Sequence, residues 1–126
     1  MCGICGFSGH ANDGLLDQMG NAIRHRGPDG SGCYSDGRMN LCSRRLSIVD
    51  PVSGGQPVEN EDSTVFAVWN GEIYNYRSLI TELKGKGHLF SSDHSDSELI
   101  VHLYEEYGIR FVEKLNGMFA IALWDR

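Results

Sequence analysis

The segment that most constrains the fold is residues 117–124 (GMFAIALW), because it is apolar at nearly every position. A strand of this composition belongs in a sheet that is covered on both faces, since an exposed face would carry polar side chains at alternate positions. Apolar residues make up 40% of the chain, which is enough for a packed core. We therefore expect sheets sandwiched between helices, in an α+β layered architecture.

Further strands are expected from composition and from turn residues. Residues 65–69 (VFAVW) are rich in β-branched and aromatic side chains and predict a second buried strand. The Gly-rich residues 3–7 can form a first strand, and residues 33–34 and 39–42 can flank a turn at Ser35-Asp36-Gly37. Loops are predicted where Gly and Pro concentrate, at residues 24–32 and 50–60.

Three helices are predicted from apolar side chains at helical spacing and from capping residues. Asn12 or Asp13 can cap the first helix, Asn75 can cap the second, and residues 95–98 (SDSE) read as a capping box for the third. The first helix carries Leu15, Leu16, Met19, Ala22 and Ile23 at helical spacing. The second has Tyr76, Leu79, Ile80 and Leu83 on one face and is ended by Gly85 and Gly87. The third is expected to bury Leu99, Ile100, Leu103, Tyr104 and Tyr107 and to end at Gly108.

The charge distribution excludes several classes of protein. The net charge is −6, and no basic cluster is longer than the pair Arg44-Arg45, so no basic face is available to neutralise nucleic-acid phosphates. No apolar run approaches the roughly 20 residues of a membrane-spanning helix. The N-terminus does not read as a signal peptide, so we expect a reducing, cytoplasmic location.

The four cysteines point weakly to metal or redox chemistry. Cys2 and Cys5 have C-x-x-C spacing, but Cys33 and Cys42 are too far apart to complete a zinc site of two close pairs. A redox motif would follow a strand and open a helix rather than start the chain. We expect Cys5, Cys33 and Cys42 to be small buried apolar residues.

The histidines show no shared spacing that suggests a catalytic triad or a metal cluster. No metal site is predicted from them, and none is given a catalytic role. They are His10, His25, His88, His94 and His102.

Cys2 differs from the other cysteines because of its position. If Met1 is removed, Cys2 carries a free α-amine whose pKa is roughly 7.7–8. That amine can accept the thiol proton, directly or through one water, and can later protonate a leaving amine. Nucleophile and base would then belong to one residue, as in hydrolases that begin with a catalytic threonine.

Seven segments distributed along the chain carry a resemblance to a known family. In this order, they closely resemble the class II glutamine amidotransferase domain of glutamine-hydrolysing asparagine synthetases, and RHRGPD, RLSIVD and NGEIYN are together very specific. The segments are residues 1–6 (MCGICG), 24–30 (RHRGPDG), 45–50 (RLSIVD), 55–57 (GQP), 70–75 (NGEIYN), 95–98 (SDSE) and 115–125 (LNGMFAIALWD).

The resemblance implies a role for each matching residue in the reaction. Cys2 is the nucleophile, and the side-chain amide of Asn70 and the backbone N–H of Gly71 form the oxyanion hole. The plainer interpretation of Cys2 is a buried residue in the first strand. The plainer interpretation of Asn70-Gly71 is a hairpin turn after an apolar strand.

The resemblance also implies how glutamine is held. Arg45 grips the α-carboxylate with its planar guanidinium, while Glu72 and Asp96 lie where the α-ammonium is bound. Arg45 could instead be a solvated arginine, and Asp96 could simply favour a helix N-terminus. Backbone groups that help to line the site belong to Leu46, Ser47, Ile48 and Val49.

The architecture implied is the four-layer sandwich of N-terminal-nucleophile hydrolases, with helices outside two antiparallel sheets. Residues 1–126 would form one such domain, C-terminally incomplete, and an ATP-dependent synthetase domain would be absent. No cofactor is expected here, and ATP and magnesium are expected only in that domain. Residues 53–55 (SGG) resemble the start of a pyrophosphate loop, but Gln56-Pro57-Val58 breaks that pattern.

Two alternatives remain open at this point. The same front domain could serve an amidotransferase with a different ammonia acceptor. The chain could also be a non-catalytic interaction module, particularly if Met1 is retained and the α-amine of Cys2 stays acylated. The sequence also leaves open the assembly of identical chains.

Overall fold

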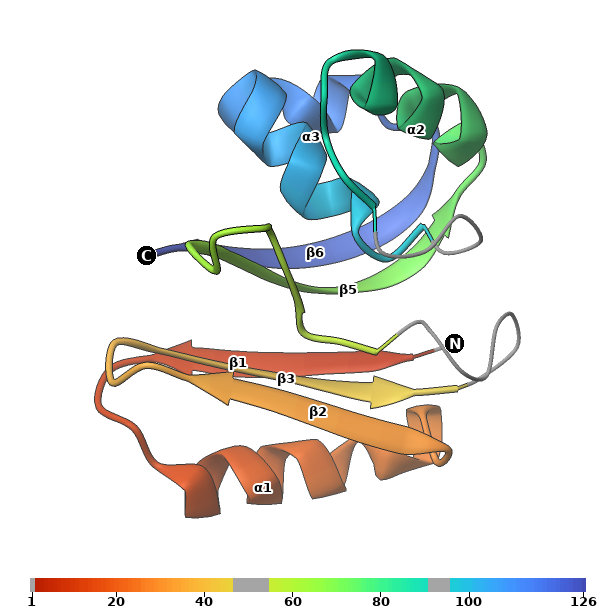
Figure 1. Ribbon diagram of the computed structural model, residues 1–126. Helices are drawn as coiled ribbons and strands as arrows, with labels where there is room; N and C mark the ends of the chain where they lie inside the picture. The colour runs from red at the N-terminus through yellow and green to blue at the C-terminus, as the bar shows by residue number, and fades with distance from the viewer. Residues whose placement is uncertain (1, 47–54, 91–95) are drawn as a thin grey trace.

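The computed structural model describes residues 2–46, 55–90 and 96–126 of the chain. Figure 1 shows the order of the elements along the chain. The described elements are β1 (Gly3–Ser8), α1 (Asp13–Ala22), η1 (Arg24–Arg26), β2 (Gly30–Ser35), β3 (Met39–Arg45), β4 (Val58–Glu59), β5 (Val65–Ile73), α2 (Tyr76–Gly85), α3 (Leu99–Tyr107), η2 (Gly108–Lys114) and β6 (Gly117–Asp125).

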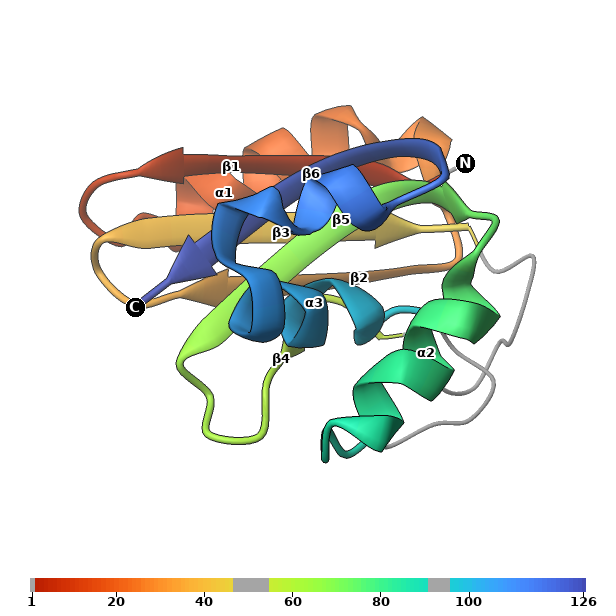
Figure 2. The same cartoon turned by 90° about the horizontal axis from the view of Figure 1, so that it is seen from above.

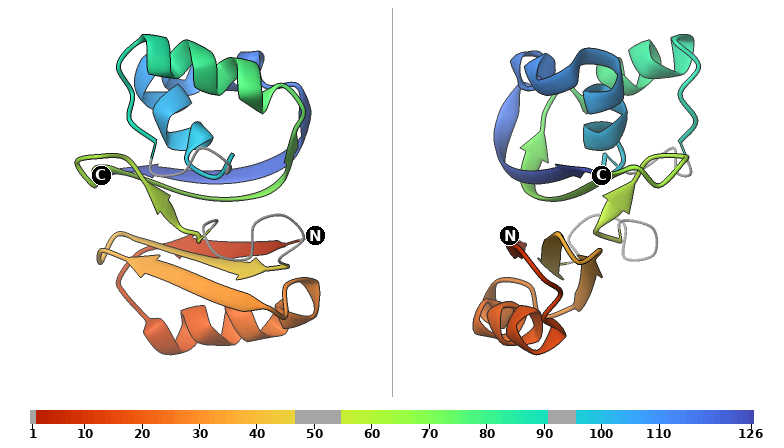
Figure 3. Two further views of the ribbon diagram at one scale, coloured as in Figure 1. Left: turned by 45° about the vertical axis from the view of Figure 1, so that its right-hand side comes forward. Right: turned by 90° about the vertical axis from the view of Figure 1, so that its left-hand side faces the viewer.

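The strands form two antiparallel sheets that stack on each other. Their strand orders are β1-β3-β2 and β4-β5-β6. Helix α1 covers the outer face of the first sheet, and α2 and α3 cover the outer face of the second (Figures 1 and 3). The prediction of an α+β fold with two antiparallel sheets is confirmed. No helix within the described ranges combines the length and the apolar character needed to cross a bilayer.

Residues 65–69 of β5 are buried on both faces of the strand, as their composition predicts. Successive side chains of a strand point to opposite faces. Ala67 and Trp69 therefore pack in the cluster that includes the buried side chains of α2 and α3. Phe66 and Val68 pack against Leu41 of the first sheet. The core thus has one part between the sheets and a larger part beneath α2 and α3.

The prediction that residues 117–124 are covered on both faces is wrong for the first half of β6. Its residues pair with β5, and within the described ranges no strand lies along its other edge. Met118 is 50% exposed and Phe119 is 39% exposed. Apolar composition correctly indicated a strand here, but cover depends on elements that pack from elsewhere in the fold.

The helix ends agree only partly with the predicted caps. Asn12 caps α1, because its side-chain oxygen accepts a hydrogen bond from the Leu15 amide at 3.0 Å. Asn75 precedes α2 but makes no capping bond; its Nδ2 donates to the Lys114 carbonyl at 2.9 Å, and its Oδ1 accepts from the Asn116 amide at 3.0 Å. It therefore ties α2 to the chain before β6.

Helix α3 begins at Leu99 with Glu98 as the preceding cap residue and no side-chain cap bond. The predicted capping box had its cap at Ser95, which lies outside the described residues. Gly108 ends α3 as predicted, with a φ of 57° and its amide bonded to the Tyr104 carbonyl. The strands β2 and β3 are longer than predicted, and the two-residue β4 was missed.

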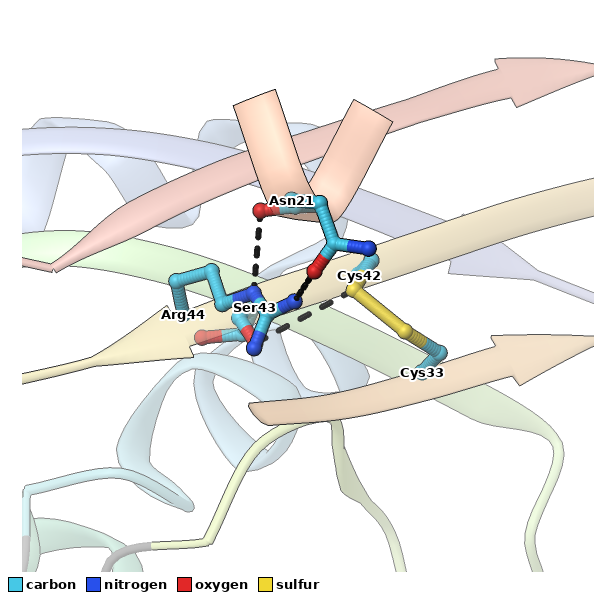
Figure 4. Close-up of a disulfide and its surroundings, with 6 residues drawn as sticks. Asn21, Cys33, Cys42, Ser43 and Arg44 are labelled. Atoms are coloured by element: carbon cyan, nitrogen blue, oxygen red, sulfur yellow. Dashed lines mark hydrogen bonds between the residues drawn. A yellow bond between two sulfur atoms is a disulfide. The ribbon is translucent and has the colours of Figure 1, made fainter. Parts of the chain in front are cut away.

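The prediction that Cys5, Cys33 and Cys42 are all buried is wrong for two of these three cysteines. Cys42 is buried, whereas Cys33 is exposed and Cys5 is only partly buried. Cys33 lies directly opposite Cys42 across β2 and β3, with Cα atoms 4.1 Å apart, and the two form a disulfide (Figure 4). Cys5 lies opposite Cys42 on the other side, in β1.

Candidate active site

Cys2 lies just before β1, at the end of the first sheet where β3 finishes. The antiparallel register pairs Gly3 with Arg44, so the start of β1 is adjacent to the end of β3. The Leu46 amide lies 3.5 Å from the Cys2 Sγ, and the Sγ lies 3.9 Å from the Leu46 carbonyl oxygen. The thiol is partly exposed. Two residues of the predicted site, 44 positions apart in sequence, are therefore in contact.

The RHRGPD segment packs against this end of the sheet through its backbone and one arginine. Arg26 donates from Nε to the Cys2 carbonyl at 3.4 Å, and the Asp29 amide donates to the Arg45 carbonyl at 3.0 Å. A Cβ atom on Gly27 would lie only 2.3 Å from the carbonyl carbon of Arg44. Only glycine allows so close an approach, and the segment thereby positions the backbone on both sides of Cys2.

Asn70, Gly71 and Glu72 lie within β5 and not in the hairpin turn that the Asn-Gly pair alone would indicate. Gly71 has a φ of 149°, and a Cβ atom there would lie 2.0 Å from the Met118 carbonyl oxygen. A side chain at this position would therefore collide with β6. Asn70 is partly buried, while Gly71 and Glu72 are exposed.

The end of β5 and the start of β1 lie at the same end of the sandwich. In Figures 1 and 3 the start of β1 lies at the same end of the molecule as the point where β5 leads into α2. Cys2, just before β1, and Asn70 and Gly71, in the second half of β5, therefore lie toward this same end of the sandwich. The sheet stacking decides this arrangement.

Asp96 and Glu72 lie in one electrostatic environment. Burial raises the pKa of Asp96, and the negative charge of Glu72 adds to the rise. A cation beside Asp96 would favour its ionised form. The role of Asp96 and Glu72 in binding an α-ammonium stays a prediction.

Two positioning residues were not singled out from the sequence. The Gln56 side-chain oxygen accepts from the Trp69 amide at 2.7 Å, and the Gln56 carbonyl lies against Gly32, where a Cβ atom would be 2.0 Å away. Trp69 in turn donates from its indole to the Ser97 carbonyl at 3.2 Å. The GQP segment (residues 55–57) was part of the resemblance, but only the tertiary structure shows that Gln56 joins β2 to β5.

Arg45 is the last residue of β3, opposite Gly30, and is partly buried. Its predicted contact with a glutamine carboxylate stays a prediction. Leu46 is placed beside Cys2. Three other residues of the predicted lining lie outside the described residues: Ser47, Ile48 and Val49.

The sequence profile of the glutamine amidotransferase domain matches residues 1–126. The chain therefore belongs to the glutamine amidotransferase domain family. Within it, the chain is 45% identical over 130 residues to asparagine synthetase [glutamine-hydrolyzing] 1 of Arabidopsis thaliana, covering 99% of this chain and 22% of that protein. The predicted resemblance is confirmed.

A second relative agrees with this family, and a solved structure shares the fold. Asparagine synthetase [glutamine-hydrolyzing] 2 of Bacillus subtilis (strain 168) is 44% identical over 133 residues, covering 100% of this chain and 17% of that protein. The chain thus spans about a fifth of the length of these relatives. The structure of glutamine phosphoribosylpyrophosphate amidotransferase from B. subtilis, complexed with ADP and GMP, shares the fold. Its TM-score is 0.75 at 18% identity, over 99% of this chain and 35% of that chain.

Proposed function

We propose that this chain is the glutaminase domain of an asparagine synthetase-like amidotransferase, and that it hydrolyses glutamine to glutamate and ammonia through a thioester on Cys2. The observation that carries the proposal is the position of Cys2 beside Leu46, at the end of the sandwich where β5 also ends. The family membership supports the class of reaction.

The proposed reaction needs a base, a nucleophile and an anion site. With Met1 removed, the free α-amine of Cys2 takes the thiol proton, and the thiolate attacks the side-chain amide carbon of glutamine. The Asn70 amide and the Gly71 N–H stabilise the tetrahedral oxyanion. The α-ammonium then protonates the amide nitrogen of the tetrahedral intermediate, which leaves as ammonia and gives the thioester. Water attacks the thioester to release glutamate and restore the thiol.

Substrate recognition is proposed to use both charged ends of glutamine. Arg45 pairs with the α-carboxylate, for which its planar guanidinium is suited, and the backbone of residues 46–49 lines the same end of the site. Asp96 and Glu72 hold the α-ammonium, whose positive charge offsets the repulsion that contributes to the raised pKa of Asp96.

The ammonia is proposed to be used in a further ATP-dependent domain to convert aspartate to asparagine. ATP and magnesium would act there, and no cofactor is proposed for residues 1–126. A cytoplasmic location is part of this proposal. The share of the asparagine synthetases that the chain covers supports an additional domain. A second candidate is a different ammonia acceptor, because the fold is shared with glutamine phosphoribosylpyrophosphate amidotransferase.

The test is to label the purified chain with a chloroketone analogue of glutamine and to map the product by mass spectrometry. We expect an intact mass that lacks Met1, and one adduct per chain, on Cys2, that excess glutamine prevents. An intact chain that retains Met1, or an adduct that glutamine does not prevent, would overturn the proposal. To separate the two candidate acceptors, ammonia consumption by the full-length protein is measured with and without aspartate. Consumption that requires aspartate supports aspartate as the acceptor, and consumption without aspartate supports a different acceptor.

A further inference from the structure

Histidine spacing in the sequence predicted no metal site, but the fold brings two histidines and two glutamates together. Ligand atoms from all four residues lie within 4.8 Å of one another. We call this group the His–Glu cluster. It consists of Glu61 in the turn between β4 and β5, His88 after α2, and His102 and Glu105 on α3.

Three separations between the inward-facing atoms of the cluster are close to those between ligands of one metal ion, and all four ligand atoms lie within 4.8 Å of one another. The His102 Nδ1 lies 3.1 Å from the Glu105 Oε2 and 3.6 Å from the Glu61 Oε2. The His88 Nδ1 lies 3.6 Å from the same Glu105 oxygen. Ligands at about 2.0–2.1 Å from Zn²⁺ in tetrahedral geometry are separated by about 3.3 Å.

Three of the four residues have their other polar atom held by a neighbour. The Asn60 side-chain Nδ2 donates to the Glu105 Oε1 at 2.7 Å, and the Leu89 backbone amide donates to the Glu61 Oε1 at 3.2 Å. The His88 Nε2 lies 3.2 Å from the Glu106 Oε2. Metal-binding histidines and carboxylates are oriented by outer contacts of this kind, which here leave the Oε2 and Nδ1 atoms facing inward.

Burial and charge favour an ion of charge +2. His102 is only 2% exposed and His88 is 14% exposed, whereas Glu105 and Glu61 retain 27% and 43% exposure. Glu106 is already paired with Lys86 at 2.6 Å. The two inward carboxylates carry two negative charges, which one divalent ion would balance. Neutral imidazole and carboxylate form the ligand set that suits Zn²⁺.

We propose that the His–Glu cluster binds one Zn²⁺ ion, which fastens the β4–β5 turn and the segment after α2 to α3. Figure 2 shows the β4–β5 connection and the end of α2 on the same side of α3. By holding the β4–β5 turn and the segment after α2 against α3, the ion would fix the position of α3 relative to β5. The role is structural and independent of the proposed glutaminase reaction.

The test uses the chain with Cys2→Ser and Cys5→Ser, so that free thiols do not bind the added metal. After chelation and removal of the chelator, Zn²⁺ is titrated by calorimetry, and thermal unfolding is recorded with and without the ion. We expect one ion per chain, an affinity tighter than micromolar, and a higher Tm when the ion is bound. Co²⁺ in its place should give the intense visible absorption of a tetrahedral site.

Three variants separate a metal site from a hydrogen-bonded network. Glu61→Gln keeps an acceptor for the Leu89 amide and should weaken Zn²⁺ binding by more than about 100-fold, whereas Glu106→Gln, outside the ligand set, should weaken it by about 10–100-fold. His10→Ala, at an exposed position, should leave binding unchanged. A Glu61→Gln variant that binds as tightly as its parent, or a parent that binds no stoichiometric ion, would overturn the proposal.

Discussion

The indole of Trp69 donates a hydrogen bond to the backbone carbonyl of Ser97 at 3.2 Å, which joins β5 to the turn before α3. Trp69 immediately precedes the predicted oxyanion residue Asn70, and Ser97 immediately follows Asp96. One hydrogen bond therefore couples the positions of the predicted oxyanion hole and the predicted ammonium site. Trp69 is only 4% exposed, so this bond is shielded from water.

We expect Trp69→Phe to raise the KM for glutamine several-fold while changing kcat less. The variant loses a hydrogen bond worth about 1 kcal/mol and leaves part of the indole volume empty, so its free energy of unfolding should also fall. Tyr104→Phe is the control, since it removes a hydrogen bond from α3 to Asp125 without touching the turn. Equal KM values in the two variants would contradict a positioning role for Trp69.

Replacing Cys2 by alanine should abolish glutamine-dependent synthesis in the full-length protein and leave synthesis from added ammonia intact. Loss of the nucleophile is expected to reduce glutamate release by a factor of about 10⁴ or more. Cys5→Ala, in the same C-x-x-C pair, should stay within a few-fold of wild type. Release of glutamate by the Cys2→Ala variant at a rate near wild type would rule out the thioester.

Asp96→Asn should weaken glutamine binding and stabilise the fold near neutral pH. The pKa of Asp96 is raised in the folded protein, so folding favours its protonated form. The stability that protonated Asp96 contributes at low pH is therefore lost as pH rises through the raised pKa. Binding of the α-ammonium needs the ionised form, and removal of that charge typically costs about 2–5 kcal/mol.

The pH dependence tests the same residue. In wild type, KM for glutamine should increase as pH falls through the raised pKa of Asp96, which lies above the ordinary value of 3.8. Asp96→Asn should lack this increase. The measurements are KM against pH and chemical unfolding at neutral and acidic pH. An Asn variant that is less stable than wild type at neutral pH would contradict the assignment.

Gly71→Ala should destabilise the fold strongly, because a Cβ atom would lie 2.0 Å from the Met118 carbonyl oxygen at a φ of 149°. We expect a loss of about 3 kcal/mol or more, given both backbone strain and displacement of β6. Gly85→Ala, at a helical position with open space around it, should be neutral or gain up to about 1 kcal/mol. Thermal unfolding of the two variants compares them directly.

The 126-residue chain by itself should self-associate, because the first half of β6 presents exposed apolar side chains along an edge that has no partner within the described residues. Met118→Gln should reduce the association, while Leu89→Gln, which is exposed in a loop far from this edge in sequence, should not. Size-exclusion chromatography with light scattering measures the mass. A monodisperse wild-type monomer with full glutaminase turnover would contradict this expectation.

Local pattern determined a large part of this fold. Residues 65–69 and 117–124 were recognisable as strands because β-branched, aromatic and aliphatic side chains follow one another without polar interruption. Asn12 and Gly108 act as expected at helix ends, since capping depends on the residue and its nearest neighbours. The family resemblance was also predictable from sequence, because its short segments can be recognised without knowledge of their positions in space.

The remaining features depend on contacts between residues distant in sequence, which no local pattern specifies. The asparagine at position 75 bonds to residues 114 and 116 rather than capping its own helix, because those residues happen to pack beside it. The strand register alone sets Cys33 against Cys42. The stacking of the layers determines how much of β6 is covered. It also brings Asp96 near Glu72 and His88 near His102. Sequence thus determined the elements and the chemistry at the chain's start, and tertiary packing decided which side chains meet.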